Sequence, residues 1–129
     1  MNIEETKKLI AELISQDKYP EALIECSRLF KERPSDTENL ETFHFLFSRI
    51  QEENADFEPE NAEQYVMRGV GRFYHGEVDD SINDFDTALK LEPKFHYALK
   101  CRAFSYKALG KLQEVVNDLL SAIEISPEG

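Results

Sequence analysis

Three histidines are the first side chains to consider for catalysis, but their positions do not form a catalytic group. His44, His75 and His96 lie far apart in the sequence, and His75 directly precedes Gly76. A histidine just before a glycine that ends a helix more often hydrogen-bonds the free backbone carbonyls of that helix end than takes part in catalysis. We therefore predict no catalytic residue and expect the protein not to be an enzyme.

Two other groups of residues could bind a nucleotide or a cation. Gly69, Gly71 and Gly76 have the composition of a phosphate-binding loop, but no strand precedes them. Four aspartates follow within a short stretch, without the sharp-turn glycine and terminal glutamate of a calcium loop: Asp79, Asp80, Asp84 and Asp86. We expect no cofactor and no metal.

The two cysteines, Cys26 and Cys101, show neither the spacing of a zinc site nor that of a disulfide framework. Both lie inside apolar, periodic segments. We expect both to be reduced and buried.

The composition limits the class of protein and the kind of partner. The 129 residues include 26 acidic and 15 basic side chains, so the net charge is −11. This excess of carboxylates repels a phosphate backbone, so nucleic acid is an unsuitable partner. The sequence has no 18-residue apolar run and no basic-then-apolar leader, so we expect a cytoplasmic protein without a membrane segment.

The elements that must position any site are helices, because Leu, Glu, Lys and Ala are plentiful while Gly and Pro number five each. Residues 62–95 and 96–129 superpose without a gap when shifted by 34, so that Gly76 matches Gly110 and Ala88 matches Ala122. Such a period is the mark of a repeat protein. Each unit is predicted to form two helices that are joined at its glycine. In the first unit these helices span about 62–75 and 78–91.

Local signals support these helix ends. Asn61 with Gln64 three residues later predicts a helix start, and Gly76 predicts a helix end in the left-handed conformation. Arg68 precedes Asp84 by 16 residues, as Arg102 precedes Asp118, which predicts an ion pair between the two helices of each unit.

The second half resembles the tetratricopeptide repeat family. The resemblance rests on the 34-residue period, on Tyr65 and Leu99, on the small residues Gly69 and Ala103, and on the Ala-to-Pro ending of each unit. It implies an all-α, right-handed superhelix of stacked helical hairpins. The chain departs from the family where Ser81 and then Val115 replace a small packing residue, and where Arg72 replaces an aromatic residue that returns as Tyr106.

The first half fits the same frame less well. Residues 3–36 form a degenerate repeat, in which Tyr19 and Pro20 start the second helix. Residues 37–61 hold one extra helix and an acidic connector, and a Ser35 to Glu38 capping box predicts that this helix spans about 36–53. We therefore expect about seven helices in one domain, 1–129.

The repeat places the first helix of each pair on a concave surface. We expect this groove to be formed by residues three and four apart: Val66, Val70, Phe73, Lys100, Phe104 and Lys107. Lys7, Ala11 and Ile14 would extend it. The alternative is that these side chains only pack against neighbouring helices.

The resemblance also implies what the groove does not bind. Family members that hold the carboxylate tails of heat-shock chaperones use a lysine followed four residues later by asparagine or arginine. The corresponding pairs here are Lys7 with Ala11, Val66 with Val70, and Lys100 with Phe104. A partly apolar peptide or amphipathic helix suits these residues better.

A second surface is predicted at the carboxyl-terminal edge. Val115, Leu119 and Ala122 should pack on the preceding helix, while Val116, Leu120 and Ile123 form a second apolar stripe. A helix that is apolar on both sides is expected to be covered on both. A homodimer through this stripe is the simplest expectation. The alternative is a shortened chain whose covering helix has been removed.

We therefore expect a non-enzymatic protein-interaction module or scaffold. Its partner would be a protein or peptide, with no nucleic acid and no membrane. One alternative is a homo-oligomeric assembly subunit. Another, suggested by the family, is a secretion-type or co-chaperone adaptor that cradles segments of its partner.

Overall fold

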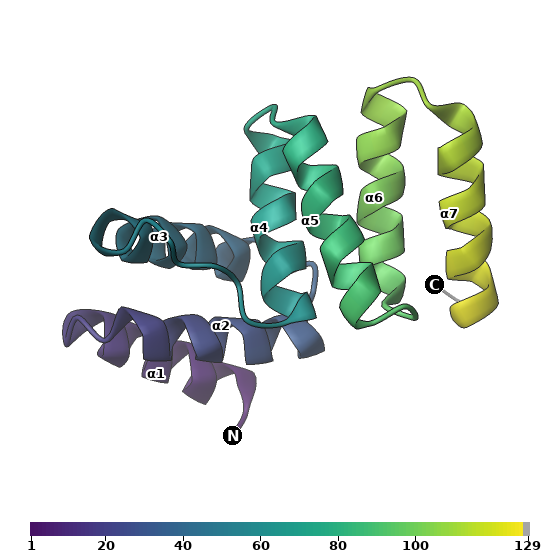
Figure 1. Cartoon of the computed structure of the whole chain (residues 1–129). Helices are drawn as coiled ribbons and strands as arrows, with labels where there is room; N and C mark the ends of the chain where they lie inside the picture. The colour runs from purple at the N-terminus through teal and green to yellow at the C-terminus, as the bar shows by residue number, and fades with distance from the viewer. Residues whose placement is uncertain (128–129) are drawn as a thin grey trace. The chain divides into compact units, whose positions relative to one another are not determined.

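The computed structural model describes residues 1–127, which form seven α-helices and no strand (Figure 1). The predicted all-α fold of helical hairpins is therefore confirmed. The helices are α1 Ile3–Ser15, α2 Tyr19–Glu32, α3 Thr37–Glu53, α4 Ala62–Tyr74, α5 Val78–Leu91, α6 His96–Ala108 and α7 Leu112–Ile125.

The chain divides into two compact units. Met1–Glu58 contains α1 to α3, and the second unit begins at Pro59 and contains α4 to α7. The boundary lies in the acidic segment that the sequence predicts as a connector. Each unit has its own packed core.

In the first unit, α2 packs against both α1 and α3. Its core consists mainly of Leu23, Cys26, Leu29 and Phe30 from α2 and Phe43, Leu46, Phe47 and Ile50 from α3. The apolar residues of α3 recur at helical spacing and form a buried stripe. The connector adds Phe57, whose ring centroid lies 5.3 Å from that of Phe47.

The predicted start of α3 is wrong by one residue. Asp36, not Ser35, is the N-cap, and its carboxylate accepts a hydrogen bond from the Asn39 backbone N–H at 3.1 Å. The same carboxylate lies 3.1 Å from the ammonium group of Lys7 on α1. Burial raises the pKa of Asp36, but the Asn39 hydrogen bond and Lys7 together bring it below its usual value. This tertiary contact favours Asp36 as the cap.

The second unit is a run of two hairpins, α4 with α5 and α6 with α7, and α5 packs against α6 (Figure 1). Gly76 and Gly110 have φ angles of +82° and +74°, so both turns use the left-handed conformation that the sequence predicts. Asn61 caps α4 by accepting from the Gln64 N–H at 2.9 Å. The Gln64 side chain accepts from the Glu60 N–H, one residue further back than a capping box requires.

Small residues allow the helices of each hairpin to approach closely. A Cβ atom added to Gly69 would lie 2.6 Å from Cε1 of Phe85, which is too close for unshifted packing. Ala88 on α5 is fully buried, and Ala103 and Ala122 are 3% exposed in the second hairpin. The small residues that recur in both units therefore lie where the helices pack most closely.

Both predicted ion pairs are present. Arg68 contacts Asp84 at 2.8 Å, and Arg102 contacts Asp118 at 2.6 Å. Arg72 also reaches Asp84, at 3.1 Å, which explains why an arginine occupies the position where the resemblance implies an aromatic residue.

Two further polar contacts join the hairpins. Arg102 contacts Asp86 on α5 at 2.8 Å, so one guanidinium group connects α5, α6 and α7. The hydroxyl groups of Ser81 and Ser105 lie 2.9 Å apart in the core between α5 and α6. Ser81 therefore replaces a small packing residue without leaving its buried hydroxyl unsatisfied.

Candidate functional site

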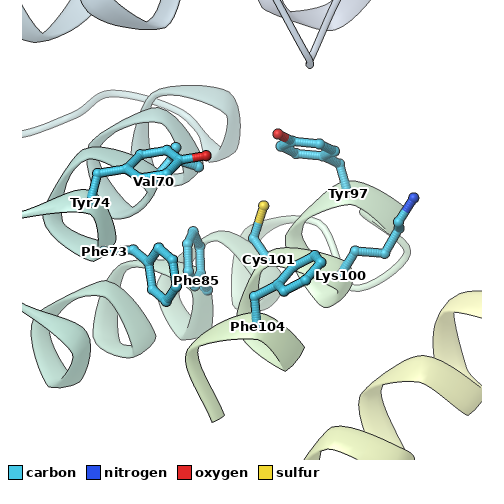
Figure 2. A pocket seen from close by; sticks show the side chains of 8 residues that line it. All are labelled: Val70, Phe73, Tyr74, Phe85, Tyr97, Lys100, Cys101 and Phe104. Atoms are coloured by element: carbon cyan, nitrogen blue, oxygen red, sulfur yellow. The ribbon is translucent and has the colours of Figure 1, made fainter. Parts of the chain in front are cut away.

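A pocket of about 280 Å³ lies among α4, α5 and α6 in the second unit (Figure 2). Its lining is mostly apolar, with two hydroxyl groups, one thiol and one ammonium group. The lining residues are Val70, Phe73, Tyr74, Phe85, Tyr97, Lys100, Cys101 and Phe104.

The repeat explains how these side chains meet. Val70 and Phe104 occupy the same position of the two units, 34 residues apart, on α4 and α6. On α6, Tyr97, Cys101 and Phe104 follow a spacing of four and three residues, which places them on one helix face. Phe85 of α5 also lines the pocket and is 1% exposed. The pocket thus lies between equivalent faces of successive repeats.

Four of the six predicted groove residues line this pocket: Val70, Phe73, Lys100 and Phe104. The other two do not. Val66 is fully buried, so it presents no atom to a ligand, and Lys107 is exposed outside the lining. Helical spacing predicts which face a residue occupies, but not how much of that face neighbouring side chains cover.

Four other lining residues were not predicted from the sequence: Tyr74, Phe85, Tyr97 and Cys101. The four-and-three spacing of Tyr97, Cys101 and Phe104 was the signal that could have identified two of them. Phe85 gave no such signal, because it belongs to the second helix of its hairpin. Cys101 is free as predicted, but it is only half-buried because it borders the pocket.

Two lining residues are strongly exposed: Phe104 by 61% and Tyr74 by 76%. In Figure 2 the hydroxyl groups of Tyr74 and Tyr97 point toward each other across the opening. Aromatic side chains exposed at the edge of a hollow are typical anchors for a binding partner.

The polar groups of the pocket are poorly suited to acid–base or nucleophilic chemistry. Burial raises the pKa of the Cys101 thiol to about 12, and burial also raises the pKa of Tyr97. Both groups are therefore protonated at neutral pH, while the thiolate is the reactive form of cysteine. The pocket can donate hydrogen bonds and hold apolar groups.

Within residues 1–127, His, Cys, Asp and Glu side chains do not gather in threes that could hold a metal ion. In the same range, none of the helices is long and apolar enough to span a membrane.

The predicted carboxyl-terminal edge is an exposed apolar surface on α7. We call it the α7 face; its residues are Leu112, Val116, Leu119, Leu120 and Ile123, each between 42% and 67% exposed. Leu119, which was predicted to pack on the preceding helix, still has 42% of its side chain exposed. Its counterpart 34 residues earlier, Phe85, is buried on a helix that α6 covers, whereas the described residues place no helix over α7.

Comparisons with known proteins identify the class of fold. No protein-family model matches the sequence. The human "Tetratricopeptide repeat protein 34" is 35% identical over 66 residues, which are 51% of this chain and 12% of that protein. The chain thus spans about an eighth of that relative's length.

Two solved structures of MamA are similar to the chain as a whole. The first has a TM-score of 0.59 at 17% identity and covers 98% of this chain and 76% of MamA. The second, titled MamA AMB-1, has a TM-score of 0.58 at 18% identity and covers 100% of this chain and 75% of its own. With the 34-residue period and the hairpins, these likenesses establish that the chain has a tetratricopeptide-type repeat fold.

Proposed function

We propose that the protein is a non-enzymatic binding module whose pocket among α4, α5 and α6 accepts a bulky apolar side chain from a peptide or helix of a partner protein. The observation that carries this proposal is the exposure of Tyr74 and Phe104 at the edge of the pocket. Residues that served only to pack the fold would be expected to be buried, as Val66 is.

The test replaces the two exposed aromatic residues. Peptides are first selected on the wild-type protein from a random library displayed on phage, and their affinities are then measured by fluorescence anisotropy. We expect Tyr74→Ser with Phe104→Ser to weaken binding by about 30-fold or more, because anchor residues commonly contribute ~2 kcal/mol or more. Both side chains are exposed, so the helical circular dichroism should remain unchanged.

The matched control replaces two exposed apolar residues of the other unit, Ile24→Ser with Phe45→Ser. This control should bind the selected peptides as the wild type does. Equal affinity of the groove variant and the wild type would contradict the proposal and place the binding surface elsewhere.

A second candidate function, self-association, is favoured by the α7 face. Its residues match positions on α5 that include Ile82 and Phe85, both buried against neighbouring helices. A second copy of the chain could cover the same surface about a two-fold axis. Self-association and groove binding use different surfaces and are compatible.

Light scattering and sedimentation test this second candidate. We expect a wild-type dimer, and a folded monomer for Val116→Glu with Leu120→Glu, because two buried carboxylates would oppose the contact. Ser121→Glu, an exposed polar position on the same helix, is the control and should remain dimeric. A monomeric wild type at high micromolar concentration would contradict it.

A further inference from the structure

The charge of α6 differs from that of the rest of the chain. Residues 93–113 contain five of the fifteen basic residues and none of the 26 acidic ones, although the net charge of the chain is −11. This segment provides four of the eight residues that line the pocket. None of the eight carries a carboxylate.

Two of these lysines flank the exposed aromatic anchor. Lys100 precedes Phe104 by four residues and Lys107 follows it by three, so all three share one face of α6. The rise of a helix places the lysines about 6 Å and about 4.5 Å along the axis on either side of Phe104. Lys100 lines the pocket and Lys107 is exposed beyond it.

Arg102, the other strongly basic residue of α6, lies on a different face of the helix from Phe104. Arg102 is held by Asp118 and Asp86, so its charge is compensated on the opposite side of the helix from the groove. On the face of α6 that carries Phe104, the basic residues are Lys100 and Lys107.

We propose that the partner segment is acidic: an amphipathic helix whose apolar side chain enters the pocket and whose side-chain carboxylates, about one turn to either side, meet Lys100 and Lys107. This inference rests on the proposed function, because it specifies the ligand of the same pocket. Opposite charges across the interface accelerate association and exclude partners of like charge.

The test uses two helical peptides of about 18 residues, long enough to form a helix, with the same apolar stripe. One carries Glu and the other Lys at the positions flanking the central Phe, and both have amidated carboxyl ends. At about 0.05 M salt we expect the acidic peptide to bind roughly tenfold more tightly than the basic one. Lys100→Glu with Lys107→Glu should reverse this preference.

The control is Lys8→Glu with Lys18→Glu, which changes the net charge by the same amount at two exposed positions of the other unit. It should keep the preference for the acidic peptide. If the wild type bound both peptides equally and Tyr74→Ser with Phe104→Ser bound neither, the acidic preference would be overturned. The proposal that the groove binds a helix would still be supported. If the wild type bound neither peptide, and Tyr74→Ser with Phe104→Ser bound the phage-selected peptides as the wild type does, the proposal that the groove is the binding site would be overturned.

One more outcome separates side-chain recognition from recognition of a chain end. If the acidic peptide bound only with a free terminal carboxylate, the proposed contact with side-chain carboxylates would be overturned. We expect the amidated and free forms to bind equally.

Discussion

Replacing Asp84 with alanine is expected to lower the free energy of unfolding by about 3 to 5 kcal/mol, the usual effect of removing one partner of a buried ion pair. The Asp84 side chain is 3% exposed and accepts hydrogen bonds from two guanidinium groups, those of Arg68 and Arg72. The Arg68 side chain is 11% exposed. Without Asp84, the largely buried Arg68 would lose the carboxylate that accepts two of its hydrogen bonds.

The matched control is Asp86→Ala. Asp86 makes one contact with Arg102, its side chain is 40% exposed, and Arg102 keeps its bonds to Asp118 in the variant. We therefore expect a loss below about 1 kcal/mol. Denaturant unfolding followed by circular dichroism measures the loss of unfolding free energy in both variants. Hydrogen exchange of the α4 and α5 amides shows whether the loss in Asp84→Ala lies in the second unit.

A double variant tests the mechanism. Arg68→Met with Asp84→Ala should lose less stability than the sum of the two single variants, because each single change removes one ion of the pair and leaves the other in place. Equal losses for Asp84→Ala and Asp86→Ala would show that the buried network contributes no more than a surface pair.

Replacing Phe85 with alanine should cost about 3 to 5 kcal/mol, because the change opens a cavity in the contact between α4 and α5. Phe85 is 1% exposed and its ring lies against Gly69. The repeat provides a control at the equivalent position, Leu119→Ala on α7. Leu119 is 42% exposed, so we expect a loss below about 1 kcal/mol.

Denaturant unfolding at low micromolar concentration compares the two variants. Similar losses at Phe85 and Leu119 would contradict the difference in burial. A loss at Leu119 that grows with protein concentration would instead indicate that a second copy covers the α7 face.

Much of the local structure could be predicted because its causes lie within a few residues. The left-handed turns follow from Gly76 and Gly110, since other residues pay a steric cost there. The cap at Asn61 follows from a side chain that reaches the first free backbone N–H groups. The 34-residue period then brings Arg68 and Asp84 onto facing sides of one hairpin, which is why their ion pair could be predicted from spacing alone.

Tertiary packing decided what depends on neighbouring helices. Asp36 caps α3 in place of Ser35 because Lys7 of α1 lies beside it, a contact that no local pattern encodes. Val66 is buried and Phe104 exposed although both fit the same helical face, and Leu119 is exposed although its counterpart Phe85 is buried. A periodic sequence determines the direction in which a side chain points, whereas its exposure depends on which helix lies opposite, and that is a property of the folded array.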